Sequence, residues 1–212
     1  MTIYILKNEN AEELLQFMSE QRLEKINDIK NEKVREEKIC AFALLRYVLF
    51  MEYGITEAPE FSYGEREKPY LKNFPHIFFS LSHAGGYSAC AVSDMEIGID
   101  LQDYRPMKEN ISEKICTRKE IYEVYGGESP SPSETTCRLW CMKESYGKLT
   151  GKGFAEGFDS IETGDLREKN VLKVTDIRLD GKDFFLSACA YEPLRSMETE
   201  FTTEKDIRYI LS

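Results

Sequence analysis

Three charged side chains in two separate stretches have the types and spacing for phosphate chemistry. Asp100 lies in Gly-Ile-Asp-Leu-Gln (98–102), and Glu144 and Lys148 lie in Trp-Cys-Met-Lys-Glu-Ser-Tyr-Gly-Lys (140–148). Asp100 and Glu144 together could hold Mg²⁺, which takes one or two carboxylates and completes its octahedron with phosphate oxygens and water. Taken alone, Glu144 and Lys148 also fit a surface ion pair, which is worth only about 0.2–0.5 kcal/mol.

The two stretches are predicted to be a strand and a helix. Residues 97–102 alternate, so that Asp100 points away from the apolar face of a short strand. Residues 138–149 predict a helix with Glu144 and Lys148 on a face turned away from its apolar stripe. The stripe consists of Leu139, Met142, Tyr146 and Leu149. The helix is expected to end at the glycines that follow it, Gly151 and Gly153.

The composition restricts the class of protein. A length of 212 residues allows one domain or two small ones, and a hydrophobic fraction of 42% can build a core. The net charge of −10 argues against a general nucleic-acid binder, although a local cluster of cations can still bind an anion. No apolar run approaches membrane-spanning length, and the N-terminus has no export pattern. The six cysteines lack zinc-site spacing, so we expect reduced thiols in a cytoplasmic protein without membrane contact.

The whole pattern predicts an α+β protein built from two similar halves. The sequence Ser-Ala-Cys-Ala occurs at 88–91 and again at 187–190. Each half would supply helices followed by a meander of strands. We therefore expect two halves, 1–105 and 106–212, that pack face to face with a ligand in the cleft between them.

The expected elements follow from periodicity and turn residues. In the first half, strands are expected at 2–6, 76–83, 87–93 and 97–102, the last three as a meander, and helices from about 11 to 17 and over 39–53. In the second half, helices are expected around 109–116 and 118–125, with Thr117 as a cap, and Ser133 is a candidate cap for the helix that carries Trp140. Strands are then expected near 159–163, 171–179, 183–191 and 206–211, with a hairpin turn at Asp180-Gly181.

Two side chains of the first half are candidate anion contacts. Arg46 interrupts an apolar helix, so it is either directed at an anion or snorkels at the edge of the core. His83 ends a strand at a Gly-Gly turn, where it is either a satisfied turn histidine or an anion contact. The mixed charges of residues 20–38 indicate an exposed, salt-bridged helical surface.

These stretches, in this order, resemble the 4′-phosphopantetheinyl transferases, specifically the two-lobed Sfp type. That family carries a Gly-x-Asp strand and, further along, Trp-x-x-Lys-Glu-(Ala/Ser)-x-x-Lys and a Gly-x-Gly turn. Here the turn is Gly-Lys-Gly-Phe at 151–154. Other similar segments are Leu44-Leu-Arg46, Lys68-Pro69-Tyr70, Phe79-Ser-Leu-Ser-His83 and Thr117-Arg-Lys-Glu120.

The resemblance implies an enzyme that transfers 4′-phosphopantetheine from coenzyme A to a serine of an acyl or peptidyl carrier protein. The reaction would depend on Mg²⁺, with Mn²⁺ as an alternative, and would release 3′,5′-ADP. The implied fold is a pseudo-dimer of two α/β halves with coenzyme A in the cleft. The partner would be a carrier protein of fatty-acid, peptide or polyketide synthesis, and residues 104–132 are where we expect it to dock on a monomeric enzyme.

The resemblance also assigns roles. Asp100 and Glu144 would bind the metal, with Gln102 contributing through water. Glu144, or a metal-bound water that it orients, would act as the base for the carrier serine, and Lys148 would stabilise or protonate the leaving phosphate. Coenzyme A would be bound by Lys30, Lys33, Arg46, Glu67, Lys68, Pro69, Ser82, His83, Lys143 and Lys148, and His83 would also belong to the catalytic set. Glu120 would face the same site, and Arg35 and Lys38 are alternatives to the two lysines of the basic run.

Gln102 departs from the family pattern, because many relatives carry a glutamate there. A neutral amide should leave the metal more weakly bound in the absence of coenzyme A. Two other interpretations stay open: a coenzyme A or nucleotide pyrophosphate hydrolase with water as acceptor, and a non-catalytic coenzyme A-binding protein. The complete set of Lys143, Glu144 and Lys148 favours activity.

Overall fold

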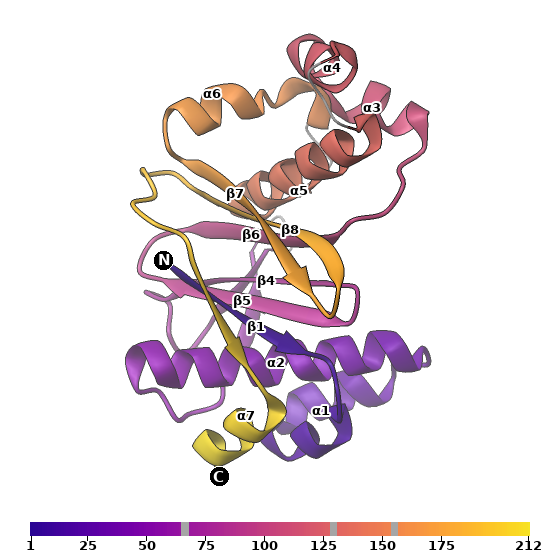
Figure 1. The fold of residues 1–212 in the computed structure, drawn as a ribbon. Coiled ribbons are helices and arrows are strands. Elements are labelled where there is room, and N and C mark those ends of the chain that lie inside the picture. The colour runs from indigo at the N-terminus through magenta and orange to yellow at the C-terminus, as the bar shows by residue number, and fades with distance from the viewer. Residues whose placement is uncertain (65–67, 128–130, 154–156) are drawn as a thin grey trace. The chain divides into compact units, whose positions relative to one another are not determined.

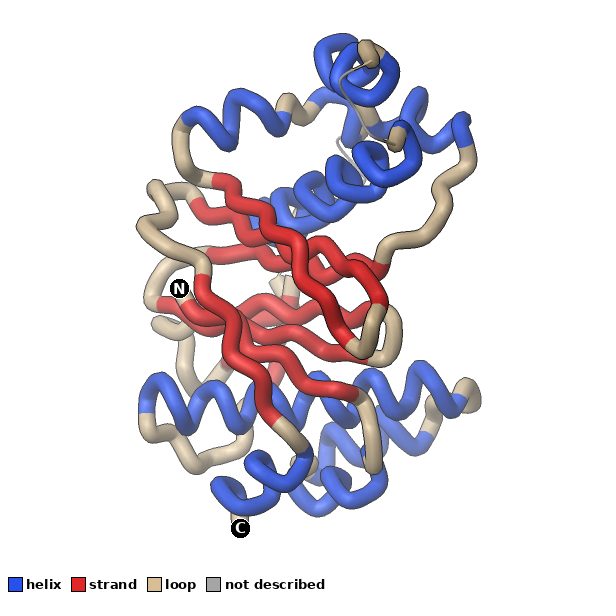
Figure 2. Tube along the Cα trace, in the orientation of Figure 1, coloured by secondary structure: helices blue, strands red, loops and turns tan. Residues whose placement is uncertain are grey.

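The computed structural model describes residues 1–212 apart from 65–67, 128–130 and 154–156. The chain forms two compact units, Met1–Met95 with Met197–Ser212, and Glu96–Ser196. Each unit is a mixed α/β structure whose main sheet carries helices on one face (Figure 1, Figure 2). This division differs from the expected halves, because the strand at 97–103 pairs inside the second unit and the C-terminal segment returns to the first.

The first unit is built on a four-stranded sheet in the order β4-β5-β1-β9. Its strands are β1 (Thr2–Lys7), β4 (Phe78–Ala84), β5 (Tyr87–Ser93) and β9 (Glu198–Thr202). Its helices are η1 (Ala11–Phe17), α1 (Glu20–Asn27), α2 (Glu32–Tyr53) and α7 (Glu204–Leu211), and a small hairpin joins β2 (Phe61–Tyr63) to β3 (Pro69–Leu71). β1 pairs antiparallel with β5 and parallel with β9, so the two ends of the chain lie together in one sheet.

Helix α2 is the central helix of the first unit and packs on β5 (Figure 1). Its start is capped by Asn31, whose side chain accepts a hydrogen bond from the backbone N–H of Val34. Its stop is Gly54 at φ 67°, a left-handed conformation that glycine adopts without strain. Between them lies a run of buried apolar side chains from Ile39 to Leu49, interrupted by Arg46.

Two expectations for the first unit are wrong. Residues 206–211 are helical rather than extended, because Thr203 and Asp206 form a reciprocal capping box at the start of α7. The strand of this region is β9, just before the helix. The meander also stops after two strands, because β1 takes the place beside β5 that was expected for residues 97–102.

The second unit contains a three-stranded antiparallel sheet in the order β6-β8-β7. Its strands are β6 (Ile97–Asp103), β7 (Leu172–Leu179) and β8 (Lys182–Ala190), and its helices are α3 (Glu109–Ile115), α4 (Arg118–Tyr125), α5 (Pro132–Thr150), η3 (Phe158–Ser160) and α6 (Thr163–Glu168). The predicted hairpin is confirmed, since Asp180 and Gly181 take φ values of 48° and 75° between β7 and β8. The strand expected at 159–163 is wrong, because these residues form η3 and the start of α6.

Helix α5 packs on β6 and β8 (Figure 1). Leu139, Met142 and Leu149 are buried in the core of the second unit, and Tyr146 packs against that core. The N-cap is Ser131, which accepts from the backbone N–H of Glu134. The expected cap, Ser133, instead accepts a hydrogen bond from the backbone N–H of Met107.

The repeated Ser-Ala-Cys-Ala lies in the middle strand of each main sheet. It forms part of β5, between β4 and β1, and part of β8, between β6 and β7. These small side chains are buried and let a long helix approach, α2 on β5 and α5 on β8. The two units therefore share one building element, a long helix on a strand of small residues. Across the part of the chain that the structure describes, no helix combines the length and apolar character needed to cross a membrane.

Candidate active site

Gly98 determines how closely α5 approaches β6. A Cβ atom at position 98 would lie 2.0 Å from the carbonyl oxygen of Ser145 and 2.5 Å from the backbone nitrogen of Leu149. No side chain fits in this space, so the glycine allows direct contact between the two backbones. Since alternate residues of a strand share a face, Asp100 also faces α5. The Gly-x-Asp spacing thus places a carboxylate beside the helix.

Asp100, Glu144 and Lys148 lie together where α5 crosses β6. The ammonium of Lys148 donates to Oδ1 of Asp100 at 2.7 Å, and Asp100 is only 5% exposed. The pKa of Glu144 is raised to about 7, chiefly by burial and then by the charge of Asp100, whereas the charge of Lys148 lowers it. The structure therefore places Glu144 and Lys148 in a partly buried cluster with Asp100, rather than in a solvated surface pair.

The polar partner expected beside Asp100 is engaged elsewhere. The amide nitrogen of Gln102 donates to the backbone carbonyl of Asp103 at 3.0 Å and to its carboxylate at 3.3 Å. Outside the three undescribed segments, no group of three or more His, Cys, Asp or Glu side chains is arranged around a common metal position. The candidate donor set is therefore the carboxylate pair of Asp100 and Glu144, and a water-mediated role for Gln102 stays a prediction.

Lys143 lies next to Glu144 in sequence but has a different environment. Its ammonium is fully buried, and its three N–H groups are shared among four acceptors: Glu120 at 2.5 Å and the backbone carbonyls of Ile115, Phe158 and Ile161 at 2.7 Å each. The predicted phosphate contact of Lys143 is wrong, because the side chain points into the core of the second unit and its donors are engaged there.

Glu120 likewise has a structural position rather than the expected one facing the site. It is 1% exposed and accepts from the backbone N–H groups of Thr117 and Thr163 as well as from Lys143. Together with Thr117 it forms the capping box that starts α4, which confirms Thr117 as the cap. The family-like Thr-x-x-Glu segment thus anchors a helix to Lys143.

Arg46 supports the first unit from α2. Its guanidinium donates to the carbonyl oxygen of Phe17 at 2.7 Å and to that of Thr56 at 2.8 Å. These bonds tie the end of η1 to the loop after α2. The sequence allowed Arg46 either to bind an anion or to lie at the edge of the core. The structure favours the second interpretation, because two nitrogens of the guanidinium already donate to backbone carbonyls.

The other predicted coenzyme A contacts of the first unit lie on different elements. His83 Nδ1 lies 3.4 Å from the carboxylate of Glu37, and the preceding Ser82 is buried in β4. Lys30 and Lys33 are exposed around the start of α2. Lys68 and Pro69 are located at the start of the β3 strand, whereas Glu67 lies outside the described residues.

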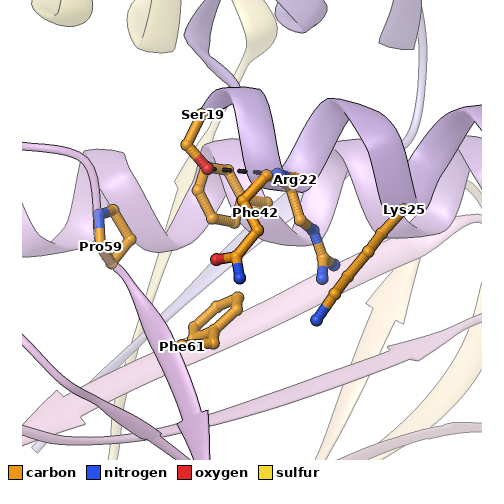
Figure 3. Close-up of a pocket in the computed structure, with 7 residues that line it drawn as sticks. Ser19, Arg22, Lys25, Phe42, Pro59 and Phe61 are labelled. Carbon is orange, nitrogen blue, oxygen red and sulfur yellow. Dashed lines mark hydrogen bonds between the residues drawn. The ribbon is translucent and has the colours of Figure 1, made fainter.

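A shallow pocket in the first unit gathers cations that the sequence did not single out. Arg22 and Lys25 of α1 extend on the same side, toward Phe61 (Figure 3). The guanidinium carbon of Arg22 lies 5.5 Å from the ring centres of both Phe42 and Phe61. The other lining residues are Ser19, Gln21 and Pro59. Arg22 and Lys25 are three positions apart on a helix, and this spacing could have indicated that they share a face. The surrounding run of mixed charges indicated only a solvated surface.

The family model and the known proteins that match this chain all point to 4′-phosphopantetheinyl transferases. Residues 96–193 match the model of the 4′-phosphopantetheinyl transferase superfamily. "4′-Phosphopantetheinyl transferase Sfp" from Bacillus subtilis (strain 168) is 27% identical over 157 residues, which cover 74% of this chain and 70% of that protein. A second Bacillus subtilis "4′-phosphopantetheinyl transferase" is 26% identical over 190 residues and 83% of both chains. "4′-Phosphopantetheinyl transferase psf-1" from Bacillus pumilus is 30% identical over 119 residues, 56% of this chain and 51% of its own.

The matched region contains the site built above. It begins at β6 with the Gly98-to-Asp100 segment and includes all of α5 with Glu144 and Lys148. The relatives with the longer alignments extend the similarity over most of the chain. The chain is therefore similar to the enzymes of the 4′-phosphopantetheinyl transferase superfamily, and over most of its length to Sfp-type members of that superfamily.

Proposed function

We propose that this enzyme transfers 4′-phosphopantetheine from coenzyme A to a serine of an acyl or peptidyl carrier protein in a Mg²⁺-dependent reaction that releases 3′,5′-ADP. The observation that carries the proposal is the cluster of Asp100, Glu144 and Lys148 at the crossing of β6 and α5, inside the region that matches the family. Two carboxylates and one ammonium in a partly buried position suit a reaction on a diphosphate.

The carboxylate pair fits a divalent cation. The charge of Asp100 raises the pKa of Glu144, as expected for two carboxylates that lie near each other in a partly buried position. Mg²⁺ accepts one or two such ligands and leaves its other positions to phosphate and water, and Mn²⁺ has similar preferences. When bound, the ion would neutralise charge on the diphosphate of coenzyme A.

The positions of Glu144 and Lys148 in the cluster support the roles proposed for them. Glu144 would accept the proton of the carrier serine, because its carboxylate belongs to the cluster at which the diphosphate would react. The serine oxygen would form a bond to the phosphorus that carries pantetheine, and the bond from that phosphorus to the bridging oxygen would break. Lys148 would then stabilise or protonate the oxygen of the departing 3′,5′-ADP.

The cationic pocket supports binding of the nucleotide end of coenzyme A. Arg22 and Lys25 offer two positive charges to a phosphate, and Phe61 offers an apolar wall. His83, Lys68 and Pro69 of the same unit keep their predicted nucleotide contacts in this proposal. The pseudo-dimer with coenzyme A in its cleft, implied by the resemblance, also remains a proposal.

A loading assay tests the reaction. The enzyme is mixed with coenzyme A, Mg²⁺ and a panel of apo-carrier proteins, and each carrier is weighed by mass spectrometry. One added phosphopantetheine is expected for at least one carrier, and Asp100→Ala should abolish it while Asp183→Ala, an exposed carboxylate of β8, should not. Release of 3′,5′-ADP without any carrier would instead support the hydrolase, and an unmodified panel would contradict the transferase.

The nucleotide contacts are tested by comparing coenzyme A with 3′-dephospho-coenzyme A. If Arg22 and Lys25 bind the 3′-phosphate, Arg22→Gln and Lys25→Gln should raise KM for coenzyme A about tenfold and should change KM for the dephospho form little. Lys33→Gln is the matched control and also tests the original prediction for the exposed run. A larger increase in KM for Lys33→Gln than for Arg22→Gln would indicate that residues 30–33, and not Arg22 and Lys25, bind the 3′-phosphate.

A further inference from the structure

The neighbouring lysines of α5 differ in how firmly they are held. Lys143 is fully buried among Glu120 and several backbone carbonyls. The side chain of Lys148 is 30% exposed, and its hydrogen bond to Asp100 spans 2.7 Å. A long, partly exposed side chain can change rotamer at low energetic cost, whereas a buried ammonium surrounded by acceptors cannot.

The position of Lys148 is unfavourable for a second cation on the same carboxylate. An ammonium 2.7 Å from Oδ1 of Asp100 would lie only a few ångströms from a divalent ion bound to that carboxylate. Because Asp100 is almost fully buried, water would screen this repulsion poorly. A cation on one oxygen of Asp100 therefore weakens the binding of a second cation to the same carboxylate.

From these contacts we infer that Lys148 and the divalent cation compete for Asp100. The lysine neutralises the buried carboxylate until the cation displaces it, and displacement frees the ammonium for the phosphate of the substrate. The inference rests on the proposed function, because it takes Asp100 as a ligand of the metal. It makes Lys148 a group with two positions rather than a fixed phosphate contact.

The competition predicts a gain of metal affinity when the ammonium is removed. Lys148→Met keeps the length and apolar stem of the side chain but cannot neutralise Asp100. In the natural chain Mn²⁺ has to overcome the charge-assisted hydrogen bond between Lys148 and Asp100, whereas in the variant this bond is absent. We therefore expect the variant to bind Mn²⁺ about tenfold more tightly than the natural chain. Lys148→Gln, which is also uncharged, should show a gain in the same direction.

The experiment measures Mn²⁺ binding by the full-length chain without coenzyme A. Free Mn²⁺ is followed by electron paramagnetic resonance at constant ionic strength and pH, so no enzymatic turnover is involved. Lys182→Met is the matched control, because it removes the same charge from an exposed position on β8 of the same unit. Asp100→Asn identifies the binding that belongs to this site, and circular dichroism checks that each variant is folded.

The outcomes separate this inference from the proposed function. Tighter, Asp100-dependent binding in both Lys148 variants, with Lys182→Met unchanged, supports competition. Equal or weaker binding in both variants, beside Asp100-dependent binding in the natural chain, overturns the inference and leaves the metal site standing. If Asp100→Asn changes nothing in any background, both the inference and the proposed metal site fail.

Discussion

Replacing Lys143 by methionine tests the correction that the structure makes to its predicted role. The side chain keeps its approximate volume but loses its ammonium. Glu120 then becomes a buried carboxylate without a cation, and the carbonyls of Ile115, Phe158 and Ile161 lose their donor. If Lys143 is structural, the substitution should cause a large loss of stability. If Lys143 instead contacts a phosphate, the substitution should change only KM for coenzyme A.

The size of the loss follows from burial. Removing one partner of a buried ion pair costs about 3–5 kcal/mol, because the other charge is left uncompensated. The pair here is 0% exposed on the lysine side and 1% on the glutamate side, so solvent offers little relief. For a chain of this length each kcal/mol corresponds to roughly 2–4 °C in Tm, which gives a decrease of roughly 6–20 °C.

The assay can be confined to the second unit. Trp140 is the single tryptophan of the chain and packs edge-on against Phe158, with ring centres 5.8 Å apart. Urea unfolding followed by its fluorescence therefore reports the region around Lys143. Adding Glu120→Gln to Lys143→Met removes the uncompensated charge and should recover about 1–3 kcal/mol.

The reasoning is refuted by one pattern of results. If Lys143→Met unfolds at the same urea concentration as the natural chain while KM for coenzyme A rises, Lys143 contacts the substrate and the buried pair is not its role. Lys173→Met, at a less buried position on β7 of the same unit, is the control for loss of a lysine charge.

Three further predictions follow from the same contacts. Gly98→Ala should push α5 away from β6, since its Cβ would lie 2.0 Å from the Ser145 carbonyl; activity should fall at least tenfold, and normal loading of a carrier would contradict the packing argument. Glu144 keeps its proton more tightly in the folded state, so the free energy of unfolding of the metal-free chain should fall as pH rises from about 4.5 to about 7. Glu144→Gln should remove that slope, which urea titrations with EDTA at pH 5 and pH 8 measure, and an unchanged slope would show that another group causes it. Arg46→Met should destabilise the first unit by about 1–3 kcal/mol in far-ultraviolet circular dichroism without raising KM for coenzyme A, whereas a rise in KM at unchanged stability would return Arg46 to the ligand.

The local sequence was sufficient for the elements that carry the candidate site. The apolar stripe of residues 139–149 and the alternation of 97–102 each depend on a short period, so they predict which face of a helix or strand is buried. The Gly-x-Asp spacing is also local, and the structure shows why it matters at Gly98. For these reasons the meeting of Asp100, Glu144 and Lys148 could be anticipated from the residues and the family resemblance together.

Only the tertiary structure decided which partners these elements meet. Lys143 is separated by 23 positions from Glu120, and no local pattern distinguishes a lysine aimed at a buried carboxylate from one aimed at a phosphate. The pairing of β6 with β8, and the return of β9 to β1, join residues far apart in sequence. Arg22 and Lys25 became candidates only when Phe42 and Phe61, from a later helix and strand, formed a pocket beside them. Periodicity determines the face that a side chain takes, but the surface opposite that face is supplied by distant parts of the chain.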